Sequence, residues 1–448
     1  MASIVKRKKK YSVVYSIIDE NGDKHQKWET FATNADAKKR KSQIEYQKSV
    51  GTFIVPTAKT VCELLEEYVS IYGVNTWALS TYGDRKALID NYINPQMGTV
   101  KLDDLTPRIM DKFYKDLLTV KAKPHPYQTK SGCVSARRVI EIHKLLKNAF
   151  NQAVKWELMS RNPAIHATLP KHEAAVRKIW TADILFEALE KCNDDILALA
   201  INLAFSCSLR LGEMLGLTWN CVDISEGSIA TGIACIFINK ELQRATKKSL
   251  DELNNKDVIK MFPPLSENNH TTLVLKTPKT KTSMRKVFLP KTIAEMLINR
   301  KKELEEIQEL LGDEFTDYDL VFCNAAGRPL EGQIINRALK TLIKENDLPD
   351  VVFHSLRHSS ITYKLKLNGG DMKSVQGDSG HSQIKMVADV YSHIIDEDRR
   401  LNAQRFEDTF YSKNNKNEEN LQDDKTQLLK LLENPEMAKL LKALAQSI

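Results

Sequence analysis

The sequence predicts a multidomain protein that is mainly α-helical and carries small β-sheets. Its 448 residues exceed the usual size of one domain, and 42% of them are hydrophobic, which is enough for several cores. Helical periodicity dominates most of residues 57–165 and 180–410, whereas alternating, strand-like segments are short. We therefore expect a small β-sheet with one helix at the N-terminus, then a helical bundle, then a mixed α+β domain.

Charge and cysteine usage narrow the class of protein. The net charge of +8 is compatible with a nucleic-acid partner, and the first 50 residues hold twelve Lys or Arg against six Asp or Glu. Seven cysteines without a C-x-x-C pair argue against a disulfide framework or a structural zinc site, and favour a reducing cytoplasm. The longest nearly apolar run, residues 196–209, is shorter than the roughly 20 residues of a membrane span. We expect no membrane association and no signal peptide.

Residues 1–55 are predicted to form the small sheet-plus-helix domain. The basic run KRKKK leads into YSVVYSIID, and Asn21-Gly22, a tight-hairpin signal, separates it from HQKWETFAT. Thr33 or Asn34 is placed to cap a helix that ends before Gly51. Basic residues with interleaved aromatics on a small sheet suit insertion into a DNA groove. The alternative is a small structural domain with basic flanks.

Residues 57–165 are predicted to form a bundle of four amphipathic helices. The helices are expected to begin near Thr60, at a Ser80 cap, at Thr106 with a proline in the first turn, and after the basic loop that ends near residue 132. Residues 166–179 lack an apolar period and are predicted to be an interdomain linker.

Residues 180–410 are predicted to form the mixed α+β domain. A buried helix over residues 196–209 stops at Arg210, and Glu213 follows three residues later. A buried arginine is costly unless it meets an anion, which is either Glu213 or a ligand. Strand-like segments follow, with a polar insertion at residues 247–269.

The segment TTLVLKTPKTKTSMRKVFLP is predicted to form a strand, a basic turn and a second strand. Such a hairpin tip suits one lysine near a phosphate, although basic tips are more often merely solvated. Its cationic side chains are Lys276, Lys279, Lys281, Arg285 and Lys286.

Residues 353–393 hold the densest group of reactive side chains. His354, Arg357, His381 and Tyr391 fall within this one segment. An arginine holds phosphate oxygens by forked hydrogen bonds, a histidine moves protons near neutral pH, and a tyrosine hydroxyl can act as a covalent nucleophile. The combination favours chemistry on an anionic ester over a helical segment with scattered polar residues.

Residues 411–448 are predicted to be a flexible tether followed by an amphipathic segment that Pro435 interrupts. This tail is a candidate for packing against a neighbouring subunit. If deletion of residues 412–448 left the pairing of two DNA duplexes unchanged, that role would be excluded.

Taken together, the chain resembles the tyrosine recombinase (phage integrase) family, and among its members the integrases of Gram-positive temperate phages and conjugative transposons. The resemblance covers nearly the whole chain except about the last 40 residues. It rests on motifs in a fixed order: SLRLGE at 208–213, TPKTK at 277–281, HSLRH at 354–358, GHS at 380–382 and YSH at 391–393.

Three features depart from the usual family pattern. Ser379 stands where the family often has leucine, and the insertion at residues 247–269 lengthens a strand connection. The lysine assignment is open between Lys279 and Lys281, and the Pro-Lys-Thr sequence favours Lys279.

The resemblance implies that Tyr391 attacks a DNA phosphodiester and forms a 3′-phosphotyrosine. Arg210 and Arg357 would stabilise the charge on phosphorus, and Lys279 would protonate the leaving 5′-oxygen. Glu213 would hold the first arginine motif together.

The resemblance also implies roles for two histidines. His354 would assist proton transfer at the tyrosine, and His381 would hold a phosphate oxygen or orient its neighbours. Neither a metal ion nor another cofactor is expected, because the bond energy stays in the covalent link.

The implied domains are an arm-type DNA-binding domain (1–55), a core DNA-binding domain (57–165) and a tyrosine recombinase catalytic domain (180–410). The implied partner is double-stranded DNA at core and arm attachment sites, bound by a homotetramer. A directionality factor and a host DNA-bending protein are further expected partners, with a cytoplasmic, nucleoid-associated location in a bacterial cell. The expected outcome is integration and excision of a mobile element or viral genome.

Two other function classes fit parts of the sequence. A type IB topoisomerase shares the chemistry but needs no specific site, and a separate basic N-terminal module argues against it. A non-catalytic DNA-binding regulator would not need the complete set of reactive residues.

Overall fold

The computed structural model describes the chain in two compact units, Met1–Ala175 with Ala245–Lys256, and Val176–Arg244 with Asp257–Ile448. Not described are residues 1, 8–9, 19–23, 50–57, 124–131, 173–177, 265, 381–382, 392–403, 406, 408–434, 437–438, 440–441 and 444–448. The backbone but not the side chain is described for residues 17, 18, 24, 25, 27, 43, 46–49, 281, 386 and 389–391.

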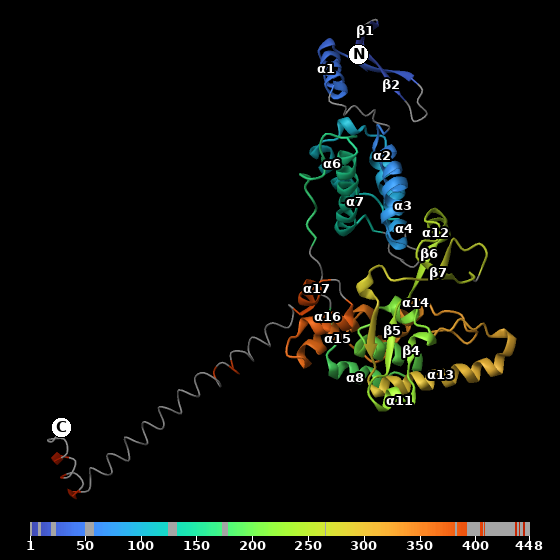
Figure 1. The fold of residues 1–448 in the computed structure, drawn as a ribbon. Helices are drawn as coiled ribbons and strands as arrows, with labels where there is room; N and C mark the ends of the chain where they lie inside the picture. The colour runs from blue at the N-terminus through green and yellow to red at the C-terminus, as the bar shows by residue number, and fades with distance from the viewer. Residues whose placement is uncertain are drawn as a thin grey trace. The chain divides into compact units, whose positions relative to one another are not determined.

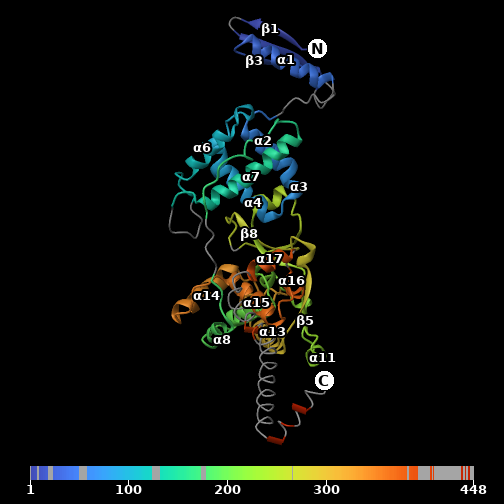
Figure 2. The ribbon, with the colours of Figure 1, turned by 90° about the vertical axis from the view of Figure 1, so that its left-hand side faces the viewer.

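The N-terminal part is a three-stranded antiparallel sheet with one helix on one face (Figure 1, Figure 2). Its elements are β1 (Ser3–Arg7), β2 (Lys10–Ile18), β3 (Lys24–Phe31) and α1 (Asn34–Ser49). Val13 and Tyr15 of β2 are buried with Ala37 and Ile44 of α1, so alternate β2 side chains face the helix. The predicted turn at Asn21-Gly22 lies outside the described residues.

The sequence predicted the two longer strands and the helix of this part. Thr33 is the capping residue, because its hydroxyl accepts a hydrogen bond from the Asp36 amide at 3.2 Å. Strand β1 is additional: it includes the start of the basic run and pairs with β2 along its whole length.

A helical bundle follows, with buried faces at helical spacing. Its elements are α2 (Val61–Glu67), η1 (Tyr68–Gly73), α3 (Val74–Thr76), α4 (Leu79–Leu88), η2 (Ile89–Ile93), α5 (Asn94–Met97), η3 (Leu102–Asp104), α6 (Pro107–Leu117) and α7 (Ala136–Lys155).

The helix starts in the bundle test the predicted caps. Thr60 forms a capping box with Glu63, and Thr106 caps α6 with Pro107 in its first turn, as predicted. The prediction that Ser80 caps a helix was wrong. Helix α4 begins at Leu79, one residue earlier, because the Leu79 side chain is buried in the bundle and Ala78 takes the extended N-cap conformation.

One segment of the first unit comes from far along the chain. Helix α12 (Lys247–Glu252) packs against α4, and the Lys256 ammonium donates to the Asn75 carbonyl at 3.0 Å. Leu250 and Leu253 of this segment are buried. The predicted polar insertion at residues 247–269 therefore includes an ordered helix and, after it, strand β7 (Val258–Met261).

The second unit combines helices with two small sheets. Its helices are α8 (Ala182–Glu190), α9 (Asp195–Ser206), α10 (Leu211–Leu215), η4 (Trp219–Cys221), α11 (Glu226–Ala230), η5 (Lys281–Ser283), α13 (Lys291–Leu311), η6 (Gly312–Glu314), α14 (Gly332–Glu345), α15 (Phe353–Leu367), α16 (Met372–Ser379) and α17 (Ile384–Tyr391). Its remaining strands are β4 (Val222–Asp223), β5 (Cys235–Ile238), β6 (Glu241–Thr246), β8 (Thr271–Lys276) and β9 (Arg285–Phe288).

The predicted hairpin over residues 271–290 was wrong in its pairing. Both strands exist, but β8 lies between β6 and β7, whereas β9 pairs with β5 in the sheet β4-β5-β9. Strand β7 of the predicted insertion takes one edge of β8, and β6, which precedes the insertion, takes the other. The lysine-bearing segment therefore connects two sheets rather than capping one hairpin.

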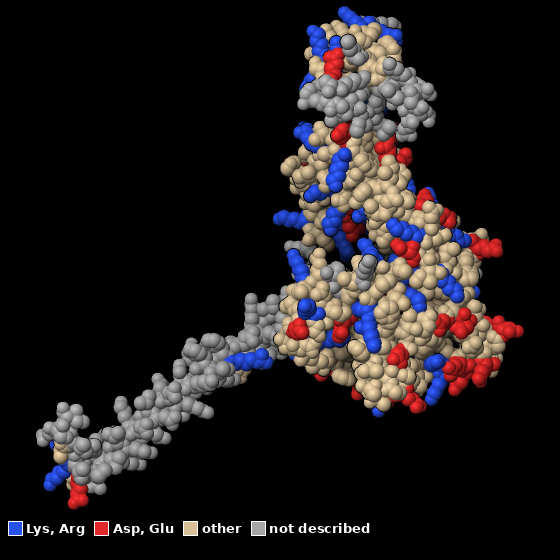
Figure 3. Space-filling view, in the orientation of Figure 1, with Lys and Arg blue, Asp and Glu red and all other residues tan. Residues whose placement is uncertain are grey.

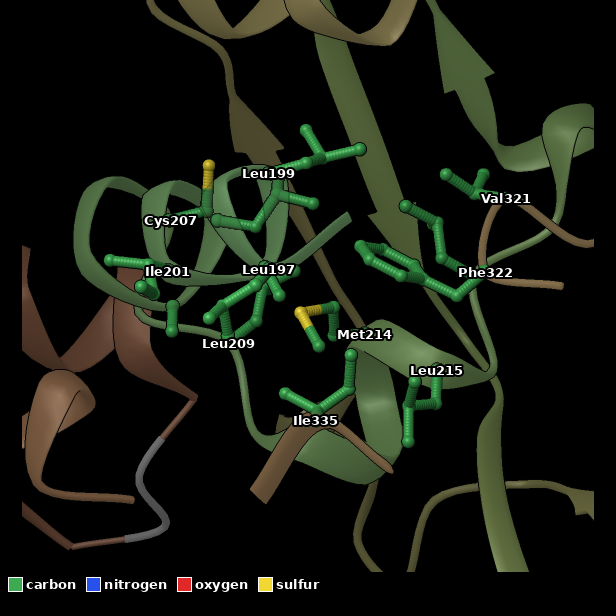
Figure 4. Packing of buried hydrophobic residues seen from close by; sticks show 14 of the residues in the cluster. Leu197, Leu199, Ile201, Cys207, Leu209, Met214, Leu215, Val321, Phe322 and Ile335 are labelled. Atoms are coloured by element: carbon green, nitrogen blue, oxygen red, sulfur yellow. The ribbon is translucent and has the colours of Figure 1, made fainter. Parts of the chain in front are cut away.

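Helix α9 is the centre of the second unit. Leu197, Ile201 and Leu203 are buried in a large apolar cluster that also includes Met214 and Phe322 (Figure 4). The sequence predicted this buried helix, which ends at Ser206. Helices α13, α14 and α15 all contact it, so the residues that follow α9 start from a fixed position. In the part of the chain that the structure describes, no helix is long and apolar enough to cross a membrane.

Candidate active site

Arg210 lies where the buried helix stops, at the N-cap of α10. Its backbone amide donates to Glu213 Oε2 at 3.0 Å, and its Nη1 donates to Glu213 Oε1 at 2.5 Å. Its Nη2 reaches the Gly380 carbonyl at 3.3 Å. The Arg210 side chain is still 33% exposed, whereas that of Glu213 is 1% exposed. Arg210 is thus held at one end and open to solvent at the other.

The turn before Arg210 has an unusual backbone. Ser208 has a φ of 53°, in the left-handed region that costs energy for a residue with a side chain. Its hydroxyl lies 2.6 Å from that of Ser360 on α15, and its carbonyl accepts a hydrogen bond from Arg357 Nη1. The strained turn therefore aims a carbonyl at the second arginine of the predicted site.

Arg357, on α15, is buried with 1% of its surface exposed. Its Nη2 donates to the Ser379 carbonyl at 2.5 Å, and its Nη1 lies 4.0 Å from Glu213 Oε2. Burial lowers the pKa of Arg357 from its ordinary value, and the neighbouring charges of Arg210 and Arg285 lower it further against the opposing effect of Glu213. Arg357 is therefore a desolvated cation beside other cations.

The departure at Ser379 is accommodated at this point. Ser379 is fully buried, and its hydroxyl donates to the Gln376 carbonyl at 3.4 Å. Its backbone carbonyl meets Arg357 whatever side chain is present. Serine in place of leucine thus keeps the contact that matters to the site.

A third arginine, Arg285, joins the same carboxylate. Arg285 Nη2 donates to Glu213 Oε2 at 2.9 Å, and Nη1 donates to Glu213 Oε1 at 3.2 Å. From the sequence, Arg285 is predicted only as one of the basic residues of the segment 271–290, called here the lysine segment. The available signal was strand alternation: Arg285 shares its inward face with Val287, whereas Lys286 and Phe288 are exposed.

Glu213 is the charge centre of this arginine cluster (Arg210, Arg285 and Arg357). Burial alone would raise the pKa of Glu213, but the hydrogen bonds and charge of Arg285 and the charge of Arg210 together lower it. Glu213 is therefore ionised, and three guanidinium groups share its single negative charge. The excess of positive charge next to the exposed end of Arg210 is an arrangement suited to an anion such as a phosphate diester.

His354 is in the first turn of α15, one turn before Arg357, and is exposed. Its ring centre lies 4.7 Å from that of His358, with the two rings perpendicular. The spacing of three residues between His354 and Arg357 places both on one side of the helix.

The surroundings of the lysines in the lysine segment bear on which of them is free to serve as the predicted proton donor. Lys276 is excluded, because its side chain is 3% exposed and its ammonium group pairs with Glu241 at 2.6 Å. Lys286 lies over the Phe288 ring at 4.9 Å. Lys279 is exposed in the connection between β8 and β9. Lys281 begins η5, and its side chain lies outside the described part, so both lysines remain candidates.

The last two predicted residues are described only in part. His381 lies outside the described residues, directly after Gly380, which ends α16 in the left-handed conformation. Tyr391 is the last residue of α17, and its side chain is not described. Helix α17 contacts α15 and α16, which supply Arg357 and the Gly380 turn. The structure thus brings Arg210 and Arg357 together and places the helix of Tyr391 beside the helix of Arg357.

The chain is similar in sequence to known families and proteins. Residues 181–398 match the Phage integrase family, and residues 60–118 match the Phage integrase, N-terminal SAM-like domain. The chain is 23% identical to the ICEBs1 integrase of Bacillus subtilis (strain 168) over 329 residues, which are 73% of this chain and 77% of the relative. It is 26% identical to a XerC-like tyrosine recombinase of Caldanaerobacter subterraneus subsp. tengcongensis over 289 residues, 62% of this chain and 67% of that one.

The fold is similar to that of a solved integrase. The Tn1549 transposon integrase, solved in complex with transposon right end DNA, superposes with a TM-score of 0.58 at 17% identity, covering 77% of this chain and 99% of that one.

Proposed function

The chain belongs to the tyrosine recombinase family of phage-type integrases, site-specific enzymes that cut and rejoin DNA, and from this premise we propose which residues carry the reaction. The observation that carries the proposal is the arginine cluster around Glu213, which holds more positive than negative charge and is open at Arg210.

In the first step, the Tyr391 hydroxyl oxygen attacks the phosphorus of a DNA phosphodiester. A bond forms between the tyrosine oxygen and phosphorus, and the bond to the 5′-oxygen breaks, which leaves a 3′-phosphotyrosine and a free 5′-hydroxyl. Arg210 and Arg357 hold the non-bridging oxygens while negative charge gathers on them. Because the guanidinium groups are fixed before DNA arrives, little reorganisation is required in the transition state.

Proton transfers complete this step. His354, exposed at the start of α15, assists removal of the tyrosine proton, and Lys279 donates a proton to the leaving 5′-oxygen, with Lys281 as the alternative donor. His381 follows the Gly380 turn that Arg210 contacts, and it holds a phosphate oxygen or orients its neighbours. A 5′-hydroxyl from a partner duplex then attacks the phosphotyrosine and rejoins the strands.

The N-terminal sheet supplies a second DNA-binding surface in this proposal. Its face opposite α1 carries Arg7, Lys10, Trp28 and Thr30 in adjacent register positions. The guanidinium carbon of Arg7 lies 4.6 Å from the centre of the Trp28 ring, and Trp28 is 42% exposed. A sheet face with cations and a polar rim suits the major groove of arm-type sites.

The surface charge is uneven in a way that bears on DNA docking. Acidic side chains gather over the C-terminal part of α13 and η6 (Figure 3), and the exposed ones there include Glu305, Glu306, Glu309, Asp313 and Glu314. This end of α13 repels a phosphate backbone. DNA therefore approaches the catalytic unit from another side.

The proposed assembly follows from the chemistry. Exchange between two duplexes needs four cleavages, so we propose a homotetramer on core sites, with residues 57–165 as the core-binding domain and 180–410 as the catalytic domain. A directionality factor and a host DNA-bending protein are proposed accessory partners, and integration and excision at the nucleoid of a bacterial cell are the proposed outcome. In native gels, the wild-type chain should form a tetramer band on paired core-site duplexes. The absence of that band would contradict this assembly.

The test is covalent trapping on a nicked suicide substrate that carries the core site. The wild-type chain should accumulate a protein–DNA adduct, and Tyr391→Phe should accumulate none, because the nucleophilic oxygen is removed. Tyr363→Phe is the matched control, since Tyr363 is a partly exposed tyrosine on α15 that packs on Phe205. If Tyr391→Phe traps as much adduct as the wild-type chain, the proposed nucleophile is wrong.

A further inference from the structure

Arg285 joins three segments that are far apart in sequence. It is the first residue of β9 and is 7% exposed. Its guanidinium donates to Glu213 on α10, its Nη1 also donates to the Ser283 carbonyl at 3.0 Å, and its Nε donates to the Asp378 carbonyl at 2.7 Å. The first arginine motif, the lysine segment and the end of α16 therefore meet at one side chain.

The hydrogen bonds of Arg285 leave little for a ligand. Four hydrogen bonds to protein acceptors use four of its five N–H groups. Arg210, which binds the same carboxylate, keeps a third of its side chain exposed. Of these two arginines, only Arg210 is built to reach a phosphate from solvent.

The Gly380 turn is shaped around Arg285. Gly380 has a φ of 63°, and a Cβ at this position would lie 2.9 Å from Arg285 Nη1 and 3.1 Å from Arg285 Cδ. Glycine is therefore required here both by the backbone conformation and by the close approach of the arginine. The Gly380 carbonyl in turn accepts from Arg210 Nη2, so the turn touches both arginines.

We propose that Arg285 is a positioning residue for the recombination reaction: it fixes Glu213 and the Gly380 turn, both of which contact Arg210, so that Arg210 is held where the phosphate binds. It also ties the lysine segment to the arginine cluster through Ser283. Arg285 does not contact DNA. The inference rests on the proposed catalytic role of Arg210, but not on the choice between Lys279 and Lys281.

The experiment uses the full chain with Arg285→Met, which removes the charge, and Arg285→Lys, which keeps the charge but loses the fork. Lys286→Met is the matched control, because Lys286 is the next residue of β9 and is exposed. Adduct formation on the suicide substrate, equilibrium affinity for the uncleaved core site, and thermal unfolding are measured for each protein.

We expect Arg285→Met to slow adduct formation about 100-fold, the order of loss that a misplacement of about 1 Å produces. Arg285→Lys should recover part of the rate, and Lys286→Met should cleave like the wild-type chain. Affinity for uncleaved DNA should stay within about twofold in all three. The pH profile adds a readout specific to positioning: without Arg285, the pKa of Glu213 rises, so the acid limb of the rate moves to higher pH.

Three results would overturn the inference. The first is an Arg285→Met rate equal to that of the wild-type chain. The second is a loss of DNA affinity that matches the loss of rate, which would make Arg285 a DNA contact. The third is a rate loss in Arg285→Met and Arg285→Lys that is fully accounted for by the unfolded fraction at the assay temperature. A wild-type chain that forms no adduct would instead contradict the proposed function.

Discussion

The two halves of the candidate active site are anchored in different ways. The arginine half (Arg210, Arg285 and Arg357 around Glu213) is cross-linked by hydrogen bonds, and Arg210 follows directly on the large apolar cluster at α9. The tyrosine half, helix α17, rests on a small separate cluster formed by Ile361, Leu365, Val375 and Val387. Among the described residues, the arginine half is thus held by several hydrogen bonds beside a large apolar cluster, while the proposed nucleophile Tyr391 belongs to a helix that packs in a smaller cluster.

This difference separates stability from activity. Damage to the arginine half should lower both the free energy of unfolding and the cleavage rate, because the same contacts serve both. Damage to the small cluster should lower the rate with little global cost, since weakly packed elements open locally without unfolding the rest.

The largest effect is expected at the charge centre. Glu213→Gln leaves three buried or half-buried arginines without a carboxylate, which should cost about 3 kcal/mol of stability and most of the cleavage rate. Because the folded-state pKa of Glu213 is lowered, its contribution is complete above its unfolded pKa and is lost as pH falls through the lower folded pKa.

Urea unfolding from pH 7 down to pH 3 checks this prediction. The stability difference between the wild-type chain and Glu213→Gln should be constant near neutral pH and narrow below about pH 4.5, the ordinary value for this group. A difference that stays constant over the whole range would contradict the role of the carboxylate charge.

An intermediate effect should distinguish the two halves with one type of substitution. Val321 and Val387 are both fully buried, the first in the large cluster and the second in the small one. Val321→Ala should lower the global free energy of unfolding by about 1–2 kcal/mol and leave cleavage nearly unchanged. Val387→Ala should slow cleavage severalfold with a smaller change in global unfolding.

Chemical unfolding and adduct-formation rates, measured on the same preparations, test the pair. Equal losses of global stability in the two variants, with equal cleavage rates, would show that the two clusters form one cooperative core. The contrast between the halves would then be wrong.

The smallest effect is expected at Ser208. Its φ of 53° favours glycine by about 1 kcal/mol, but glycine also removes the hydroxyl that meets Ser360. Ser208→Gly should therefore change stability little, whereas Ser208→Ala, which keeps the strain and loses the hydrogen bond, should be about 1 kcal/mol less stable than Ser208→Gly. Thermal or urea unfolding of the two variants side by side measures this difference, and equal stabilities would mean that the turn relaxes.

Local signals were enough for much of the fold and part of the site. The helix start at Thr60, the proline at the start of α6 and the apolar run of α9 depend on neighbours within a few residues, and each was confirmed. The spacing of Arg210 and Glu213 likewise predicted an ion pair that the structure contains.

Features that depend on distant partners could not be predicted in the same way. Strand β9 pairs with β5 rather than with β8. Its partner lies about 50 residues earlier in the sequence, so the turn between β8 and β9 does not decide the pairing. Arg285 belongs to the site because Glu213 and Asp378 meet it in space. The motif order predicts the residues that we propose to carry the reaction, but it does not include Arg285, which we propose as a positioning residue.

Residues 245–256 belong to the first unit, although the residues before and after them in the sequence belong to the second. This affects how the protein can be cut into fragments or fused with parts of its relatives. A catalytic fragment that begins at Val176 retains α12 but lacks α4, so it exposes Leu250 and Leu253 to water. Such a fragment should aggregate unless residues 245–256 are replaced by a short turn. A chimera that replaces the helical bundle of this chain should also replace residues 245–256, because α12 packs against α4 of that bundle although the two are far apart in the sequence.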